Sequence, residues 1–217
     1  MKTDPRIGFY PPMEEKLNII SHGFGFALSI LGMVLLIYRA GKYGEFLHLI
    51  SFSIFGASLI LLYAASTFYH SAKRPKLRYR LNILDHASIY VLIAGTYTPF
   101  ALITLSGVVG WSIFIVVWGL AVTGVILKLF YTGRFRLLST SMYVIMGWII
   151  VFAIKPLIAN LELPGLLWLF AGGISYTLGA VFFSIERINY NHAIFHLFVL
   201  AGSFCHYISI FLYVLPG

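Results

Sequence analysis

Seven long apolar stretches constrain the fold more than any other feature of this 217-residue sequence. A helix needs roughly 20 apolar residues to cross the hydrocarbon core of a bilayer, which is about 30 Å thick. Hydrophobic residues make up 60% of the chain and charged residues 10%, which is more apolar surface than a soluble domain of this length can bury. We therefore expect an all-α integral membrane protein with these transmembrane helices: Leu17–Tyr38, Phe46–Tyr69, Leu81–Leu105, Val108–Phe130, Leu137–Leu157, Pro164–Ile185 and Ala193–Leu215.

The segments between these spans are short, and the chain shows neither an internal repeat nor a low-complexity segment. We therefore expect one seven-helix membrane domain over residues 1–217, with residues 1–16 as a polar N-terminal segment that lacks the pattern of a signal peptide. Sharp turns are expected at residues 39–45 and 71–80, among others. Pro99 is expected to kink the third helix, and the fifth span is the weakest because Lys155-Pro156 closes it early.

The basic residues of the loops predict the orientation of the chain. Twelve of the 15 Lys and Arg residues fall in the N-terminal segment and near the loops that follow the second, fourth and sixth spans, whereas Arg39, Lys42 and Lys155 fall on the other side. The positive-inside rule then places the N-terminus in the cytoplasm and the C-terminus outside. We interpret the net charge of +8 as a topology signal and a contact with anionic lipid headgroups, and we expect no nucleic-acid partner.

This topology places three histidines at one depth in the membrane. His70 ends the second span, and His192 and His196 begin the seventh. A His-x-x-x-His pair lies on one face of a helix, and catalytic zinc takes three protein ligands while keeping one position open. We therefore predict that the three histidines bind Zn²⁺. The alternative is a set of interfacial histidines that hydrogen-bond to neighbours or headgroups.

Asp85 and Ser66 are the candidate catalytic residues. Asp85 is expected just inside the start of the third helix at the same depth, where it could orient and deprotonate a water at the metal. Its alternative role is a cap at the helix start or a partner for the basic loop before it. Ser66 lies one turn before His70 on the same face and could donate a hydrogen bond to that water or to a substrate carbonyl. Its alternative is a serine bonded back to the carbonyl four residues earlier.

A polar stripe opens the first helix at three- and four-residue spacing, and it could pack against the metal ligands as a supporting layer. The alternative is an ordinary helix start, with an acidic residue near the positive end of the helix. The stripe comprises Glu15, Asn18, Ser21 and His22.

Three further histidines receive other interpretations. His86, which adjoins Asp85, is interpreted as an interface or packing residue. His206 lies in the middle of the seventh span and is interpreted as a hydrogen-bonded packing residue that could also line a cavity. His48 lies on the opposite side of the membrane and is left out of the site.

Taken together, these residues resemble the hemolysin III family, the bacterial branch of the progestin and adiponectin Q receptor superfamily. The resemblance covers nearly the whole chain and implies a seven-helix fold with a cytoplasmic N-terminus, zinc on the three matching histidines, and the Ser and Asp close to it. The matching motifs, in chain order, are Glu15-x-x-Asn18-x-x-Ser21-His22, Ser66-x-x-x-His70, Asp85-His86, Ala94-Gly95-Thr96-Tyr97-Thr98-Pro99 and His192-x-x-x-His196.

The resemblance extends to adiponectin receptors and alkaline ceramidases, and it implies amide hydrolysis of ceramide-like lipids. Our first hypothesis is a zinc-dependent intramembrane hydrolase of lipid amides or esters in a bacterial plasma membrane, with membrane lipids as its partners. No protein hormone is expected, because the chain lacks the long N-terminal extension of the receptors. The alternatives are a cytolytic or pore-forming membrane protein, as the family name suggests, and a non-catalytic, zinc-containing regulator of membrane composition.

Overall fold

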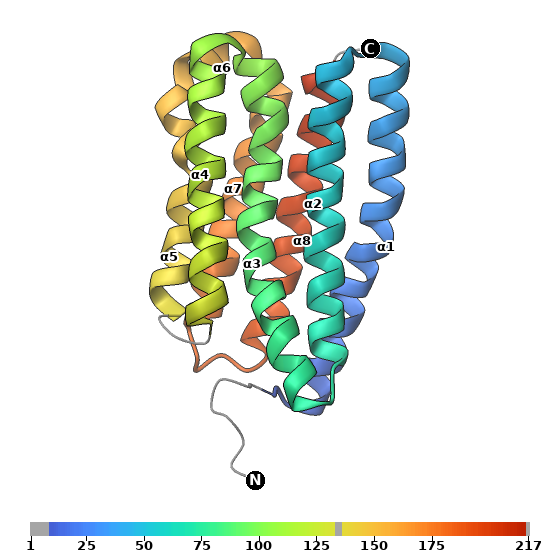
Figure 1. Ribbon diagram of the computed structural model, residues 1–217, viewed down its shortest axis with the longest axis vertical. Coiled ribbons are helices and arrows are strands. Elements are labelled where there is room, and N and C mark those ends of the chain that lie inside the picture. The colour runs from blue at the N-terminus through green and yellow to red at the C-terminus, as the bar shows by residue number, and fades with distance from the viewer. Residues whose placement is uncertain (1–8, 133–135, 216–217) are drawn as a thin grey trace.

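The computed structural model describes residues 9–132 and 136–215, and all regular structure within these ranges is helical (Figure 1). Within these ranges, seven helical segments are long and apolar enough to cross a membrane, as predicted. They stand side by side in one bundle. The first four crossings are α1 (Pro12–Tyr43), α2 (Phe46–Ser71), α3 (Pro75–Pro99) continued by a π-helical segment (Phe100–Leu105), and α4 (Gly107–Tyr131).

The fifth crossing is a broken helix, and the last two are continuous. The fifth crossing consists of α5 (Arg136–Gly147), a 3₁₀ segment (Ile149–Ala153) and α6 (Ile154–Asn160). The sixth crossing is α7 (Leu163–Ser184). The seventh is α8 (Asn191–Ser209), which ends in a second π-helical segment (Ile210–Val214). This architecture is that of a multi-pass membrane protein.

Several helices are longer than the apolar stretches that predicted them. The turn expected at residues 39–45 is wrong for the most part, because α1 continues to Tyr43. The turn expected at residues 71–80 is also too long, because α3 begins at Pro75. Proline is favoured in the first turn of a helix, where its missing N–H would have no partner, and both α1 and α3 start in this way. Hydropathy marks where a helix is apolar, not where its hydrogen bonding stops.

The distortion at Pro99 takes the form of the π-helical segment that follows it. Proline cannot donate the hydrogen bond of a regular helix. The two neighbouring threonines donate back into the helix, Thr96 Oγ1 to the carbonyl of Leu92 at 2.8 Å and Thr98 Oγ1 to that of Ala94 at 2.9 Å. The threonines therefore add hydrogen bonds in the turn before the proline, to carbonyls other than that of Gly95, which the proline leaves without its helical donor.

Tyr97 of α3 bridges the break in the fifth crossing. Its hydroxyl donates to the carbonyl of Gly147 at 2.8 Å and accepts from the backbone N–H of Ile150 at 2.8 Å. A break in a membrane-spanning helix leaves backbone groups that need partners, and this hydroxyl serves one carbonyl and one N–H. The crossing then continues past Pro156 to Asn160, so it is longer than its predicted end at residue 157.

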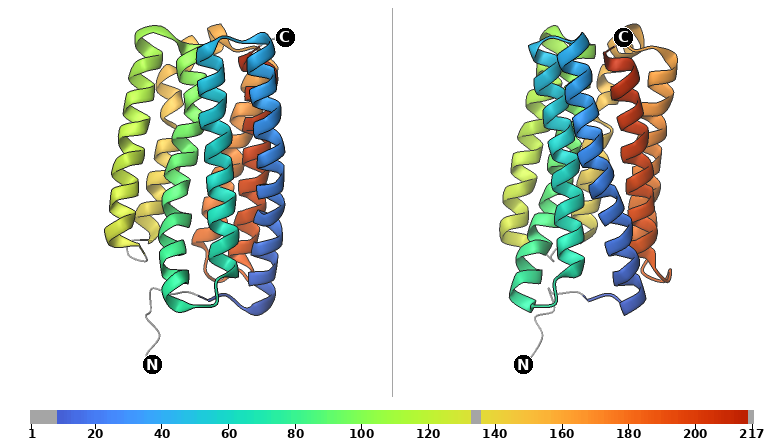
Figure 2. Two further views of the ribbon diagram at one scale, coloured as in Figure 1. Left: turned by 45° about the vertical axis from the view of Figure 1, so that its right-hand side comes forward. Right: turned by 90° about the vertical axis from the view of Figure 1, so that its right-hand side faces the viewer.

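The third crossing lies at the centre of the bundle. Of its most apolar window, 78% is buried, against at most 44% for any other crossing. Figure 2 shows α1 packed beside both α2 and α8, so the first and last crossings are neighbours. The ends of α2 and α3 that are joined by residues 72–74 lie at the same end of the bundle as the start of α8 (Figure 1).

Candidate metal centre and its cavity

The three predicted histidines meet in the structure. His70 lies at the end of α2, and His192 and His196 occupy the first turns of α8. The Nε2 atom of His192 lies 3.1 Å from the Nε2 atoms of both His70 and His196. All three side chains are buried, and one ligand atom from each lies within 4.8 Å of the others. The group could therefore hold a metal ion.

The chemistry of this donor set suits a cation. His70 Nδ1 lies 2.7 Å from Glu15 Oε2, and because a carboxylate accepts, Nδ1 carries the proton and Nε2 presents a lone pair. Zinc–nitrogen bonds of about 2.0–2.1 Å at tetrahedral angles set ligand nitrogens about 3.4 Å apart. The observed 3.1 Å is close to that spacing. If His192 and His196 also carry their protons on Nδ1, the three Nε2 lone pairs face one another, and a cation between them would relieve their repulsion.

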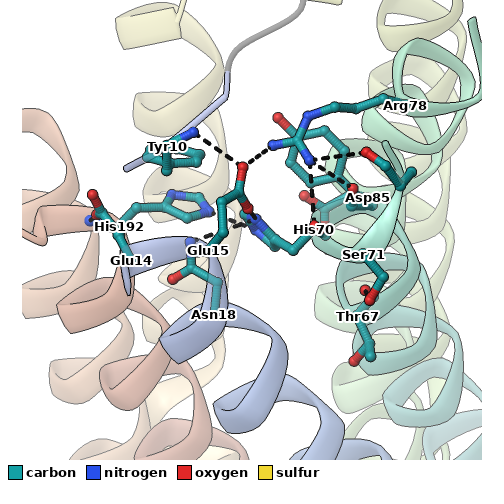
Figure 3. Close-up of polar contacts among 12 residues, drawn as sticks. Tyr10, Glu14, Glu15, Asn18, Thr67, His70, Ser71, Arg78, Asp85 and His192 are labelled. Carbon is teal, nitrogen blue, oxygen red and sulfur yellow. Dashed lines mark hydrogen bonds and ion pairs between the residues drawn. The ribbon is translucent and has the colours of Figure 1, made fainter. Parts of the chain in front are cut away.

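Arg78 holds both the helix that carries His70 and the carboxylate beside it (Figure 3). The guanidinium is almost fully buried, donates to the carbonyl of Tyr69 at 3.1 Å and forms an ion pair with Glu15. The last carbonyls of a helix lack partners within that helix, so Arg78 caps α2. Glu15 also accepts from the backbone N–H of Tyr10 at 3.0 Å. A continuous polar network therefore runs from Arg78 through Glu15 to His70.

A second acidic residue serves the start of α8. Glu14 is buried, and its Oε1 accepts from the backbone N–H of His192 at 3.2 Å. The residue before α8, Tyr190, has a left-handed backbone with φ of 60°. The ring of Tyr10 stacks on that of His192, with centroids 4.5 Å apart. The N-terminal part of the chain therefore covers the histidine group.

The polar stripe of the first helix packs against the histidines, which is the first of its two predicted roles. Asn18 Nδ2 lies 3.5 Å from His70 Nδ1, and Ser21 Oγ lies 3.4 Å from His196 Nδ1. The ring of His22 stacks on that of His196, with centroids 3.4 Å apart. Glu15 fills both roles, because it also lies in the first turn of α1.

Ser66 and Asp85 lie in the wall of a cavity of about 320 Å³ that His192 and His196 also line. Ser66 makes no hydrogen bond back to its own helix, so the alternative interpretation of this serine is wrong. The expected place of Asp85 at a helix start is also wrong, because α3 begins ten residues earlier at Pro75. The dipole of a helix acts within its first turn, so it does not explain this carboxylate.

Beyond the polar residues, the cavity is apolar and runs along α3, α5 and α7, with Ile89, Ile93 and Trp148 in its wall. His86 also lines it, and its Nδ1 bonds to the carbonyl of Asn82 at 2.9 Å, so the packing interpretation of His86 is incomplete. His206 lines the cavity too and donates to the carbonyl of Leu169 at 3.0 Å, as predicted.

Sequence reasoning missed Tyr10, Glu14 and Arg78. One signal could have revealed Arg78: with Pro75 taken as the first residue of a helix, Arg78, Asn82 and Asp85 fall on one face. Glu14 lies four residues before Asn18, so helical spacing could have added it to the polar stripe, whereas Tyr10 precedes α1 and gave no periodic signal.

The fold and the histidine group together define a class: multi-pass helical membrane proteins with a buried candidate metal centre at one end of the bundle. The profile of the family described as haemolysin-III related matches residues 11–207, and the chain belongs to this family. It is 49% identical to Hemolysin-3 of Bacillus cereus over 203 residues, which cover 94% of this chain and 93% of that relative.

Two further relatives show how far the similarity extends. The chain is 46% identical to a Hemolysin-3 homolog of Bacillus subtilis (strain 168) over 200 residues, which cover 92% of this chain and 94% of the relative. It is 30% identical to the human Monocyte to macrophage differentiation factor over 218 aligned positions, which cover 97% of this chain and 89% of the relative.

Proposed function

We propose that this protein is a zinc-dependent intramembrane hydrolase of lipid amides or esters. One observation carries the proposal: in a buried group of three histidines, His192 and His196 line an apolar cavity together with a carboxylate and a serine. Imidazole ligands suit zinc, and the carboxylate on the far side of His70 is the usual partner of a zinc-binding histidine.

Each residue has a role in this proposal. His70, His192 and His196 hold the zinc, which when bound supplies Lewis acidity at the end of the cavity. Asp85 orients a water in the cavity and accepts its proton. Ser66 donates a hydrogen bond to the water or to the substrate carbonyl. Glu15 keeps the proton of His70 on Nδ1, so that Nε2 remains a ligand.

The setting favours a lipid substrate. The cavity of about 320 Å³ lies within the bundle and has a mainly apolar lining, and ligand sites of roughly 300–1,000 Å³ are typical for small molecules. The positive-inside rule supports a cytoplasmic N-terminal end of the bundle, and in this proposal the substrate reaches the site from the inner leaflet of a bacterial plasma membrane.

Metal analysis and lipid turnover test this proposal separately. Purified protein is expected to contain about one zinc per chain and to release fatty acid from a long-chain lipid amide. Asp85→Asn should keep the zinc and lose turnover, because the base is removed and the ligands remain. If Asp85→Asn turns over lipid at the rate of the unchanged protein, Asp85 is not the base.

A second candidate function is cytolysis, and the similarity to Hemolysin-3 of Bacillus cereus is the observation that favours it. Seven apolar crossings argue against a protein that is secreted in soluble form to attack other cells. Purified protein added to erythrocytes decides between the two functions. Lysis by both the unchanged protein and His196→Ala would support a cytolysin. A zinc-containing protein without lysis and without turnover would support a non-catalytic regulator of membrane composition.

A further inference from the structure

Lys128 is a buried cation in the wall of the same cavity. It lies near the end of α4, is 4% exposed and donates from Nζ to Ser139 Oγ of α5 at 2.8 Å. Its ammonium also lies 5.8 Å from the centre of the ring of Tyr143. These two partners are neither candidate metal ligands nor Asp85, the proposed base. The proposed reaction therefore gives Lys128 no role.

The charge of Lys128 lacks a counter-charge within the part of the chain that the structure describes. The ion pairs there join Glu15 and Asp85 to other residues. An ammonium has three donors, and Ser139 supplies a neutral acceptor for one of them. Because an unpaired buried charge is costly, a lysine of this kind is usually found where it meets an anion.

The position of Lys128 indicates which part of a ligand it would meet. The end of α4 lies at the same end of the bundle as the start of α8 (Figures 1 and 2). The cavity extends from there past Ile93 and Trp148 toward the middle of the bundle. Lipids place their polar groups at the membrane surface and their chains inside. A lipid in the cavity would therefore set its headgroup beside Lys128 and its chain along the apolar walls.

We propose that Lys128 and Ser139 form a binding site for the anionic headgroup of a lipid, recognised through phosphate or carboxylate oxygens. The ammonium donates charge-assisted hydrogen bonds to the anion, and the Ser139 hydroxyl adds one more. The protein then selects anionic lipids over neutral ones with the same chains. This proposal deepens the proposed lipid hydrolase, because it names the substrate class, and it concerns binding alone.

Binding of fluorescent phosphatidic acid and of diacylglycerol with identical labelled chains tests the proposal. The full-length protein is held in micelles of a neutral detergent with a chelator present, so neither turnover nor metal content affects the result. Phosphatidic acid should bind about tenfold more tightly than diacylglycerol, as expected for a hydrogen bond to a charged group. Lys128→Met should bind the two lipids equally, and Lys128→Arg should keep the preference because it keeps the charge.

Lys155→Met is the matched control, because Lys155 is exposed on α6 at the opposite end of the bundle and does not line the cavity. It should keep the full preference. Equal binding of the two lipids by the unchanged protein, or a preference that survives Lys128→Met, would overturn the proposal. Displacement of phosphatidic acid by millimolar inorganic phosphate would overturn the lipid assignment in favour of a free anion. If the unchanged protein prefers phosphatidic acid in this assay but shows no lipid turnover in the separate, zinc-containing assay, the hydrolase is contradicted and the headgroup site still stands.

Discussion

The two ends of the bundle use the same residue types in different ways. At one end, Glu15 joins His70 and Arg78, which lie 55 and 63 positions away in the sequence. At the other end, Glu45 and His48 bond to each other across the first turn of α2 as a capping box.

The arginines show the same contrast. Arg78 is buried and joins α1, α2 and α3. Arg39 is partly exposed and donates from Nη2 to the backbone carbonyl of Leu215 at 2.7 Å. The capping box at Glu45 and the bond from Arg39 to Leu215 each join a helix end to a single partner, and structural packing requires no more than this. A buried network that crosses several helices costs desolvation energy, and this expense is typical of a functional site.

The largest expected difference between the ends concerns the histidines. His192→Ala removes a candidate ligand, and zinc affinity should fall by more than the roughly 10–100-fold loss that follows removal of an outer partner of a ligand. His48→Ala should leave the zinc content unchanged. Metal analysis after a chelator wash measures both variants. Equal zinc in the unchanged protein and His192→Ala would place the metal elsewhere.

The next difference concerns the arginines and is one of stability. Arg78→Met leaves a carboxylate and the end of α2 without their partner in a buried site, so the metal-free protein should lose about 3–5 kcal/mol of stability. Arg39→Met should cost about 1 kcal/mol, because it removes hydrogen bonds at a partly exposed site. Thermal unfolding in detergent compares them. Similar melting temperatures for the two variants would contradict the contrast between the ends.

A smaller effect is expected when the glutamates of the two ends, Glu15 and Glu45, are compared. Glu15→Gln keeps the shape of the side chain but weakens its hold on the proton of His70, so zinc affinity should fall about 10–100-fold. Glu45→Gln should leave zinc affinity unchanged, because Glu45 lies at the other end of the bundle from the histidines. The glutamine can still accept a hydrogen bond at the cap, so α2 keeps its start. Competition with a fluorescent chelator gives both affinities. An unchanged affinity in Glu15→Gln would show that this carboxylate does not orient the ligand.

The smallest effect is expected at Ser21. Its hydroxyl lies 3.4 Å from His196 Nδ1, which is long for a hydrogen bond, so Ser21→Ala should reduce zinc affinity by less than about threefold. Ser51→Ala is the matched control, since Ser51 is a buried serine near the start of α2. The same competition assay applies. A tenfold loss in Ser21→Ala would show a closer contact in the metal-bound protein.

The sequence predicted the crossings and the meeting of the histidines because both depend on simple periodic signals. Apolar length defines a span, and a count of spans fixes the end of the bundle to which each residue belongs. These two signals were enough to predict that His70, His192 and His196 meet. The lengths of α1 and α3 were underestimated, because their first turns and the last five residues of α1 lie outside the apolar stretches.

The buried charges could not be predicted in the same way. Arg78 and Lys128 were counted among the basic residues of the loops, and their burial depends on contacts with other helices. Asp85 lines the same cavity as His192 and His196, but it was predicted wrongly at a helix start, because the start of α3 was misjudged by six residues. Hydropathy treats every charge near the end of a span as exposed, whereas tertiary packing decides which of them are enclosed.

The order of the histidines along the chain has a consequence for biosynthesis. Two of the three lie in α8, and the residues that support the third come from the first turns of α1. A ribosome has therefore made the chain through the start of α8 before the group can form, and α8 must then dock beside α1. Bound metal would report that α8 has been made and inserted, and a chain truncated before residue 191 should emerge without it.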